Sequence, residues 1–487
     1  MQGERFELSN PLKETGPKPV AFDQAPPPLL KIKLNKILIY TFLYIYLALS
    51  RGICVITAKY VRDNLAAIKA SLAKRQMDYP IDKILELDKE WRALKTETQK
   101  LEAKRNKDSL EISKLKKSGN VKEAEEKIKE LATIKRAIEE NAKLLEEYER
   151  ELNKLLWNMP NILHESVPYG KDSNDNVEVK RFGEPKDRNL PGHEEILKKL
   201  GMLDLENAAK VAGARFYYLK SDIALLELSL IRFAIDTLVK KGYTLIAPPL
   251  MMKREYYKGV TSLADFEDAL YKVSESREAM QNKDIEHIED ELFMISTSEH
   301  PIAAMHANHV FSANELPKKY VGWSPCFRRE AGAHGKDTKG IFRVHQFYKV
   351  EQFIFSRQED SWKYFEELVS NEEELFKALG IPYRIVSICT GDIGIVAAKK
   401  YDLEAYLPVQ KRYGEMCSCS NCTDWQSLRL DIKYDEKGER KYVHTLNATA
   451  IATERAIVAI IENYTNEDGT ITLPDVLVPY MGKRKIG

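Results

Sequence analysis

Cysteine, net charge and long apolar runs are all scarce in this chain of 487 residues. Three of its six cysteines crowd together at Cys417, Cys419 and Cys422, which is not the spread-out pattern of a disulfide-stapled secreted domain. We therefore expect a reducing, cytoplasmic environment. The 75 basic and 74 acidic residues leave a net charge of +1. A nucleic-acid partner would have to bind a local basic patch, because the chain has no overall basic excess.

One apolar run lies near the N-terminus, from Ile37 to Leu49, after three lysines. It is shorter than the ~20 residues of a membrane-spanning helix, and no cleavage site of the A-x-A type is evident. A membrane anchor, an interfacial helix and an accidental or disordered extension all remain open. We treat residues 1–60 as an N-terminal extension and expect no stable membrane association.

Farther on, charged residues alternate with apolar ones at the 3.5-residue spacing of a coiled coil. Ser118, Gly119 and Asn120 interrupt this pattern, which then resumes. The pattern predicts a long antiparallel helical hairpin within residues 61–160. The expected seam consists of Ile84, Leu87, Trp91, Leu94, Thr98, Leu101, Ile112 and Leu115, then Ile128, Leu131, Ile134, Ile138, Leu145, Tyr148, Leu152 and Leu155.

Basic residues gather around the turn of this hairpin. Two interpretations stay open from the segment alone: a solvated coiled-coil face, or an arm that grips phosphates. The basic residues are Lys104, Arg105, Lys107, Lys114, Lys116, Lys117 and Lys122, with Lys127 and Lys129 farther along.

After the hairpin, residues 161–180 are rich in Asn, Pro, Asp and Gly and are predicted to form a linker. Residues 181–487 mix helical and strand patterns without a repeat, which indicates one α+β domain. Within it, an amphipathic helix is expected to turn at Gly242 into a strand that ends at Pro248 and Pro249.

The stretch "CFRREAGAHGKDTKGIFRVHQFYKVEQF" begins at Cys326 and predicts a charged β-hairpin. Alternation along its first strand would place Arg328 and Glu330 on one face. Arg328 can bind a phosphate bidentately, and Phe347 can offer a flat aromatic face. Taken alone, however, exposed Arg and Glu on a hairpin are usually solubility residues.

Two further stretches add chemistry. Arg455 follows a strand of small residues in "HTLNATAIATERA", and "YGEMCSCSNCTDWQ" offers Glu415 and Ser418 as hard oxygen ligands for Mg²⁺. Together with "STSEHPIA" and "CTGDIG", these stretches resemble the seryl-tRNA synthetases of standard type, a family of class II aminoacyl-tRNA synthetases. The resemblance runs from about Val61 to the C-terminus and leaves residues 1–60 outside the family pattern.

This resemblance implies a class II aminoacylation domain, built on an antiparallel β-sheet flanked by helices and preceded by a tRNA-binding coiled-coil hairpin. It implies ATP and Mg²⁺, activation of L-serine to seryl-adenylate, and transfer of serine to the terminal adenosine of tRNA-Ser, and of tRNA-Sec where that exists. It also implies a homodimer formed through the catalytic domain, with the hairpin crossing the long variable arm of tRNA-Ser.

The family pattern also assigns roles to single residues. The ATP site would comprise Arg328, Arg329, Glu330, Val344, Phe347, Glu415, Met416, Cys417, Ser418 and Arg455. Serine would be bound by Thr297, Ser298, Glu299, Arg328, Glu351, Asn447 and Thr449. Of these, Arg328, Glu330 and Arg455 would act on the reacting phosphates and adenine, and Glu415 and Ser418 would hold the metal ion.

The chain departs from the family pattern at two positions in its motifs. Ala448 replaces a usual glycine and its methyl group could crowd the substrate, and Cys417 replaces a usual serine. Cys417, Cys419 and Cys422, with His444, also permit a zinc hypothesis. A strand would nevertheless hold Cys417 and Cys419 on one face, where cysteines commonly only pack. His345 is expected to be a structural hydrogen-bonding residue.

Two other functions stay open. A ligase that charges a carrier protein is one, although such relatives lack the hairpin. A catalytically inactive synthetase-like protein that binds RNA or another partner is the second, and Ala448 keeps it under consideration.

Overall fold

The computed structural model describes residues 57–273, 291–330 and 339–487. The apolar run from Ile37 to Leu49 and residues 331–338, which belong to the expected β-hairpin, lie outside these residues. Within the described ranges, no helix combines the length and apolar character needed to cross a membrane.

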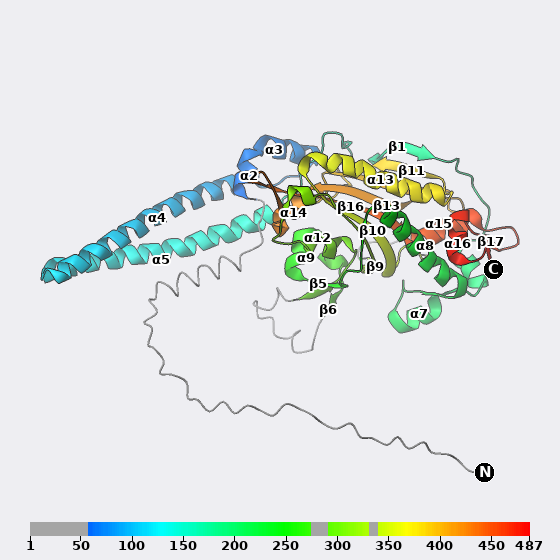
Figure 1. Cartoon of the computed structure of the whole chain (residues 1–487), viewed down its shortest axis with the longest axis horizontal. Coiled ribbons are helices and arrows are strands. Elements are labelled where there is room, and N and C mark those ends of the chain that lie inside the picture. The colour runs from blue at the N-terminus through cyan, green and yellow to red at the C-terminus, as the bar shows by residue number, and fades with distance from the viewer. Residues whose placement is uncertain (1–56, 274–290, 331–338) are drawn as a thin grey trace, which may run out of the picture. The chain divides into compact units, whose positions relative to one another are not determined.

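Two long helices, α4 (Ile81–Lys117) and α5 (Val121–Trp157), lie side by side as the predicted hairpin (Figure 1). Their turn falls at Ser118–Asn120, where Gly119 takes a φ of +81° that a side chain would strain. Two short helices, α2 (Ala58–Asp63) and α3 (Leu65–Lys74), precede them. The hairpin and its turn are therefore confirmed.

The seam between α4 and α5 also includes polar residues. Asp108 is buried there, and Asn141 donates across the helices to Thr98 Oγ1 over 3.1 Å. The prediction for Ile128 was wrong, because its side chain is exposed. Lys127 reaches across instead and pairs with Glu111 at 2.6 Å. A polar pair can replace an apolar contact at a solvated seam because a lysine stem packs while its ammonium stays in water.

The base of the hairpin packs against the rest of the chain through an apolar cluster that includes Ile84, Leu156 and Leu428. Asn161, in the segment predicted as a linker, is buried, and its amide donates to the carbonyls of Val396 and Cys422 over 2.8 and 2.7 Å. The segment 161–180 thus includes residues fixed on the following domain, and its last residues already belong to strand β1.

That domain is built on an eight-stranded sheet of order β1-β11-β12-β13-β16-β10-β9-β4. All neighbours are antiparallel except β4 and β9, which run parallel. The strands are β1 (Val177–Phe182), β4 (Thr244–Ile246), β9 (Lys318–Phe327), β10 (Gln346–Ser356), β11 (Tyr383–Ser387), β12 (Lys399–Leu407), β13 (Arg412–Thr423) and β16 (His444–Ala452). The α+β fold class is confirmed.

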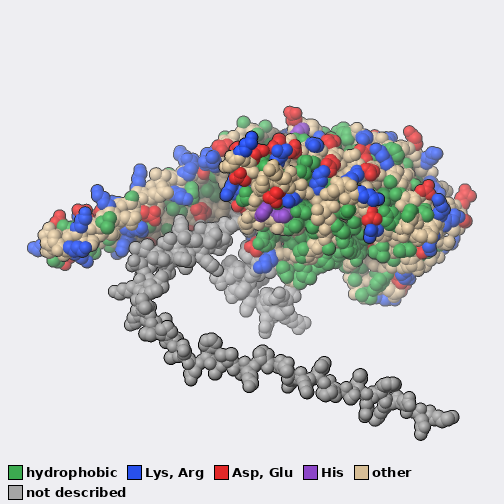
Figure 2. Space-filling model, viewed as in Figure 1, with side chains coloured by type: hydrophobic (Ala, Val, Ile, Leu, Met, Phe, Trp, Pro, Cys, Tyr) green, Lys and Arg blue, Asp and Glu red, His purple; other side chains and the backbone are tan. Residues whose placement is uncertain are grey.

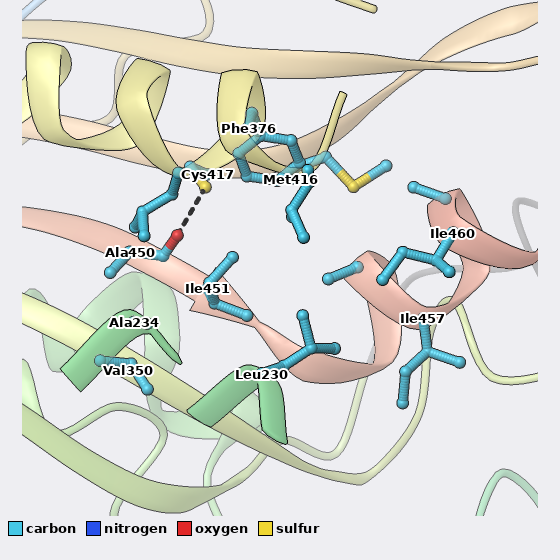
Figure 3. Packing of buried hydrophobic residues seen from close by; sticks show 14 of the residues in the cluster. Leu230, Ala234, Val350, Phe376, Met416, Cys417, Ala450, Ile451, Ile457 and Ile460 are labelled. Carbon is cyan, nitrogen blue, oxygen red and sulfur yellow. Dashed lines mark hydrogen bonds between the residues drawn. The ribbon is translucent and has the colours of Figure 1, made fainter. Parts of the chain in front are cut away.

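Three helices, α8 (Ser221–Lys240), α13 (Ser361–Ala378) and α15 (Thr453–Tyr464), cover one face of this sheet. Leu230 of α8, Phe376 of α13 and Ile457 of α15 meet Ile451 of the sheet in the main apolar core (Figure 3). Helix α8 leads through Gly242 into β4, as predicted. Because one face of the central strands is filled by helices, polar side chains on those strands gather on the other face.

Smaller elements surround this core. The helices are α6 (His193–Lys199), α7 (Leu205–Ala212), α9 (Arg254–Val260), α10 (Leu263–Phe266), α12 (Glu299–Ala304), α14 (Trp425–Leu430) and α16 (Val478–Met481). The minor strands are β2 (Leu203–Asp204), β3 (Tyr218–Leu219), β5 (Met251–Lys253), β6 (Lys272–Val273), β7 (Leu292–Met294), β8 (Val310–Ser312), β14 (Lys433–Glu436), β15 (Glu439–Tyr442), β17 (Ile471–Thr472) and β18 (Lys485–Ile486).

Candidate active site

A cavity of about 410 Å³ opens on the polar face of the sheet. Side chains from β10, β13 and β16 form its floor, and α9, α12 and the N-terminus of α15 supply parts of its wall. The predicted site residues that line it are Thr297, Glu299, Arg328, Glu330, Val344, Phe347, Glu351, Glu415, Met416, Ser418, Asn447, Thr449 and Arg455. The fold therefore brings together residues spread over more than a hundred positions of the sequence.

Arg328 and Glu330 both line the cavity, but they do not lie on a strand as predicted. Strand β9 ends at Phe327, and Glu330 has a φ of +49°. Arg328 Nε donates to the carbonyl of Ser296 over 3.4 Å, and its guanidinium lies 5.1 Å from the ring centre of Phe347. Nδ1 of His345 lies 2.8 Å from the carbonyl oxygen of Arg328, within hydrogen-bond distance. That contact is consistent with a structural role for His345.

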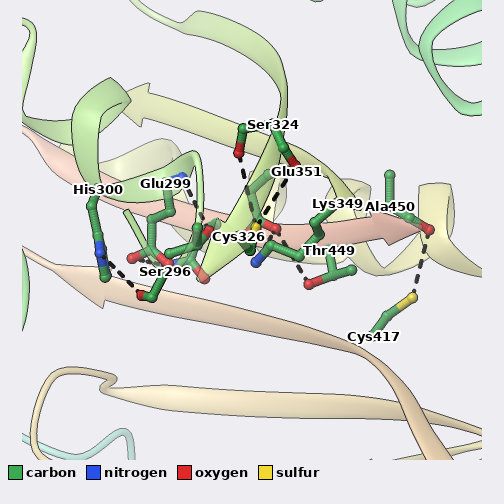
Figure 4. Close-up of polar contacts among 12 residues, drawn as sticks. Ser296, Glu299, His300, Ser324, Cys326, Lys349, Glu351, Cys417, Thr449 and Ala450 are labelled. Carbon is green, nitrogen blue, oxygen red and sulfur yellow. Dashed lines mark hydrogen bonds and ion pairs between the residues drawn. The ribbon is translucent and has the colours of Figure 1, made fainter. Parts of the chain in front are cut away.

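Glu351, on β10, lies directly opposite Thr449 on β16 because the extra residue Ala450 forms a β-bulge between them and Ile451. Thr449 Oγ1 donates to Glu351 Oε2 over 3.3 Å, and Lys349 Nζ lies 2.6 Å from the same oxygen (Figure 4). Both members of this ion pair are buried. Burial raises the pKa of Glu351, while Lys349 opposes that effect and favours the carboxylate.

Glu299, at the start of α12, forms a second carboxylate in the cavity. Its backbone N–H donates to Thr297 Oγ1 over 3.1 Å, so the two residues form one local turn. Asn447 and Gln426 each donate a side-chain amide hydrogen to Glu299 Oε1, over 3.1 and 3.0 Å. Burial, and next the charge of Glu351, raise the pKa of Glu299 to about 7. This acid therefore titrates closer to neutral pH than an exposed glutamate does.

Glu415, Met416 and Ser418 all line the cavity because β13 is irregular at this point. Glu404 pairs with Glu415 and Leu403 with Cys417, so Met416 is bulged out of the register. Without the bulge, alternation would turn Glu415 and Ser418 to opposite faces. Desolvation in the cavity opposes ionisation of Glu415, but Arg455 and Lys400 outweigh it and lower its pKa.

Arg455 lies at the first turn of α15. Its Nη1 donates to the Glu415 carbonyl over 2.8 Å and lies 3.5 Å from the Glu415 carboxylate. Its guanidinium is 5.2 Å from the centre of the Phe342 ring. Arg328 and Arg455 thus lie over different aromatic rings of the same cavity, an arrangement suited to a ligand that carries several phosphates.

The structure leaves three predicted residues outside the cavity. Arg329 has an exposed side chain and does not line the cavity. Its backbone N–H donates to the carbonyl of Ala269. Ser298 is buried behind Thr297, next to Gly322 of β9. Cys417 is buried in the main core, where its thiol faces the carbonyl of Ala450 (Figure 3). Strand alternation explains the position of Cys417, because it turns this side chain to the helix-covered face of the sheet, opposite the cavity.

The same alternation settles the orientation of Ala448. It pairs with Gln352 and Cys419, whose side chains contact carbonyls of α13. Ala448 is fully buried in the main core and does not line the cavity. Its methyl group therefore points away from the substrate space.

The three clustered cysteines do not converge. Cys417 and Cys419 face the core, whereas Cys422 lines the cavity and accepts a contact from Asn447 Nδ2 at 3.5 Å. His444 is turned to Ser361 Oγ at 2.8 Å. Residues on opposite faces of a strand cannot share one tetrahedral zinc ion. Burial raises the pKa of each thiol well above its usual value, which favours packing thiols over ligating thiolates.

Sequence reasoning missed several charged and aromatic residues of the site. The sequence did contain a signal for Lys349, because this residue precedes Glu351 by two positions and strand alternation places both side chains on the same face. Arg343, which pairs with Glu330 at 2.9 Å, and Phe342 lie within the predicted β-hairpin but precede strand β10, which begins at Gln346, so their inward direction depended on tertiary structure. Lys400 enters from β12, a strand for which the sequence offered no functional motif.

Comparison with known proteins decides the family. The seryl-tRNA synthetase N-terminal domain model matches residues 55–163, and the class II core domain model for the G, H, P, S and T enzymes matches residues 271–464. The chain is 47% identical over 461 residues to the serine–tRNA ligase of Thermococcus sibiricus, which covers 89% of this chain and 97% of the relative. The chain belongs to the seryl-tRNA synthetase family.

Solved structures of seryl-tRNA synthetases agree with this assignment. The enzyme from Pyrococcus horikoshii, crystallised with ATP, superimposes with a TM-score of 0.81 at 46% identity, covering 88% of this chain and 99% of that one. The cytoplasmic enzyme from Naegleria fowleri, in complex with AMP, has a TM-score of 0.76 at 37% identity over 89% of this chain and 99% of that one. The seryl-tRNA synthetase architecture thus extends over the hairpin as well as the sheet.

Proposed function

We propose that this chain is a serine–tRNA ligase, which activates L-serine with ATP and transfers the seryl group to tRNA. The observation that carries the proposal is the meeting of Glu351, Thr449, Lys349 and Arg328 in one cavity. A buried carboxylate and hydroxyl can bond the serine side chain, and Arg328 can bridge the carboxylate of serine and the α-phosphate of ATP.

The residues present then have distinct tasks in the first step. The serine carboxylate attacks the α-phosphorus, and pyrophosphate leaves. Such transfers need positioning and charge stabilisation more than covalent chemistry. Arg328 and Arg455 supply positive charge, and Phe347 offers a face for the adenine, with Glu330 near its amino group.

Glu415 and Ser418 fit a Mg²⁺ ion. Both offer hard oxygen atoms to the cavity, and the low pKa of Glu415 keeps its carboxylate ionised. Mg²⁺ is usually bound through one or two protein oxygens while phosphates and waters fill its other positions. When bound there, the ion would neutralise phosphate charge.

Serine can be distinguished from alanine because the Glu351 and Thr449 side chains are buried and polar. A site built around a substrate hydroxyl rejects the analogue that lacks it by roughly 10⁴ to 10⁵. Lys349 contributes by holding one oxygen of Glu351.

The hairpin turn is the proposed tRNA contact. Between residues 104 and 122, the acidic residues are Asp108, which is buried, and Glu111, which pairs with Lys127. The side chains of Lys107, Lys116 and Lys117 are exposed, so the positive charge of this segment faces solvent (Figure 2). Exposed lysines on a helical arm suit contacts to an RNA backbone, in keeping with the variable arm of tRNA-Ser as its target.

A homodimer through the catalytic domain is also proposed. Apolar side chains gather on the face that carries α8 and β9 (Figure 2). Leu228 is 61% exposed, and Leu225, Leu245 and Trp323 are exposed nearby in the same elements and β4. Such a patch is typical of an association surface. Light scattering of the intact chain and of a Leu228→Glu variant would test it, with a dimer expected for the first and a larger monomer fraction for the second.

The deciding experiment is serine-dependent ATP–pyrophosphate exchange by the purified chain, with alanine, threonine and cysteine for comparison, followed by charging of tRNA-Ser. Exchange with serine and charging are expected. Absence of exchange by a folded chain would refute the proposal and favour the inactive synthetase-like protein. That alternative loses its main support here, because Ala448 faces α13 and not the substrate space.

A further inference from the structure

Helix α14 (Trp425–Leu430) is a short, fully buried helix that contacts both the end of the hairpin and the proposed serine site. None of the proposed catalytic or binding residues lies on it. Its side chains nevertheless contact Glu299 on one side and the last carbonyls of α5 on the other.

Gln426 provides the contact with the cavity. Its Nε2 donates two hydrogen bonds, to Glu299 Oε1 over 3.0 Å and to the carbonyl of Val260 over 3.0 Å. Val260 is the last residue of α9 and itself lines the cavity. Gln426 is completely buried and does not line the cavity. Because both neighbours are acceptors, the amide NH₂ must face them, and this fixes the orientation of the side chain.

Arg429 fixes the helix itself. Its guanidinium donates to the carbonyl of Trp157 from Nη2 over 2.7 Å and from Nε over 3.1 Å, and to Met159 over 3.3 Å. These carbonyls lie at the C-terminus of α5, where helical partners are lacking. The guanidinium also stacks on Trp425 with 3.4 Å to the ring centre. Arg429 therefore attaches α14 to the end of the hairpin.

Trp157 adds a second connection between the hairpin and the cavity wall. Its indole N–H donates to the carbonyl of Lys258 over 3.1 Å, two residues before Val260 in α9. The last turn of α5 thus supports α14 through Arg429 and α9 through Trp157. Gln426 joins these two helices next to Glu299.

We propose that Gln426 is a positioning residue of the serine site, which holds the Glu299 carboxylate in place and is itself held by the attachment of α14 to the end of the hairpin. This inference rests on the proposed function, since Glu299 is one of the residues expected to bind serine and its carboxylate, when ionised, can attract the ammonium group of that substrate.

The charges around Glu299 give this role a measurable signature. Burial and Glu351 raise the pKa of Glu299 to about 7, whereas Lys349, the Gln426 amide and Arg328 lower it. Asn447 also donates to it, and buried His300 stays neutral because its pKa is lowered to about 3. Removal of the Gln426 donor should raise the pKa of Glu299 further. More of the acid is then protonated at neutral pH, so serine binds less tightly.

The test is Gln426→Met, which keeps the length of the side chain and removes the donor. In exchange assays, the KM for serine should rise about tenfold or more, and the KM for ATP should stay within about twofold. The kcat/KM for serine should increase with pH through about 7 in the unmodified chain, and this midpoint should move to higher pH in the variant. An unchanged serine KM and midpoint would overturn the proposal.

Gln352→Met is the matched control. Gln352 is also a fully buried amide, bonded to Asn371 at 2.7 Å, but it lies on the helix-covered face of the sheet. Loss of its hydrogen bonds should lower thermal stability without a specific rise in serine KM. Equal effects of the two variants on serine would show that any buried amide has this effect, and would contradict the proposal.

Arg429→Lys tests the attachment and remains informative if Gln426→Met does not fold. The lysine keeps the charge but cannot donate to several carbonyls at once. We expect a smaller rise in serine KM, again without one in ATP KM, and an effect that is not additive with Gln426→Met. An additive effect, or one on both substrates, would overturn the role of the attachment. Failure of the proposed function is distinguishable, because the unmodified chain would then show no exchange with serine.

Discussion

The carboxylate of Glu351 is held by Thr449, directly opposite on the neighbouring strand, whose hydroxyl donates to Glu351 Oε2 over 3.3 Å. Lys349 contacts the same oxygen at 2.6 Å. Two partners on one oxygen leave Oε1 as the atom available to a substrate hydroxyl. The arrangement directs the carboxylate at the cavity, and Lys349 favours its ionised form against the opposing effect of burial on its pKa.

Glu351→Gln should lower kcat/KM for serine about a hundredfold or more, because it leaves the buried Lys349 without its counter-ion and weakens the bond to the serine hydroxyl. The relative rate with alanine should fall much less, since alanine has no hydroxyl to lose. ATP–pyrophosphate exchange with both amino acids measures this. Glu165→Gln, at an exposed position, serves as the control and should behave as the unmodified chain.

Arg328 and Arg329 are adjacent in sequence but should differ sharply in function. Arg328→Ala removes a guanidinium from the cavity and should reduce exchange about a thousandfold. Arg329→Ala alters an exposed side chain that does not line the cavity and should change exchange less than about tenfold. Comparable losses in the two variants would contradict the placement of Arg329 and restore its predicted role in ATP binding.

Ala448→Gly tests the orientation of the residue that departs from the family pattern. Because the methyl group packs in the main core, its loss should lower the free energy of unfolding by about 1 kcal/mol. The KM for serine should be unchanged. Chemical denaturation and exchange kinetics measure the two quantities, and a lower serine KM in the variant would show that the methyl group does crowd the substrate.

Charge reversal at the hairpin turn should separate tRNA binding from serine activation. Lys116→Glu combined with Lys117→Glu should raise the KM for tRNA-Ser about tenfold or more and flatten its salt dependence, because phosphate contacts are lost. Exchange without tRNA should be unaffected. Lys186→Glu, at an exposed position of the catalytic domain, is the control. Equal tRNA affinity in all three proteins would refute the proposed contact.

Glu372 of α13 should destabilise the fold at alkaline pH. It is fully buried, and neither carboxylate oxygen has a hydrogen-bond partner within the described residues. Burial, and then Asp402 and Glu351, raise its pKa well above the usual value. The acid therefore stays protonated in the fold but ionises on unfolding above about pH 4.5, so stability falls as pH rises from there towards its folded pKa.

Glu372→Met should remove this dependence. We expect the variant to unfold at a higher temperature than the unmodified chain at pH 8, with a smaller difference at pH 5. Thermal unfolding at both pH values measures the effect. A variant that is less stable at pH 8 would show that the carboxylate has a stabilising role.

The hairpin was predictable because its information is local. A coiled-coil repeat, a break at Gly119 and a second repeat define two helices before any tertiary contact is known. The sequence could not predict that Lys127, and not Ile128, contacts the seam, because this depends on which residue of α4 lies opposite that part of α5. Only the packed pair brings Glu111 within reach of Lys127.

The sequence by itself determined the fold class, the family and a core set of the residues that line the cavity, because long motifs in a fixed order carry that information. Tertiary structure decided which side of each strand faces the substrate. The bulge at Met416 shifts the alternation of β13 by one position, so Glu415 and Ser418 both face the cavity while Cys417 faces α13. The bulge at Ala450 does the same in β16, so Thr449 lies opposite Glu351 on the cavity side while Ala448 faces α13. A strand pattern repeats every two residues, and a single inserted residue reverses every side chain beyond it. The support of Glu299 by α14 was also hidden from the sequence, because it joins the end of the hairpin to a helix more than two hundred residues away.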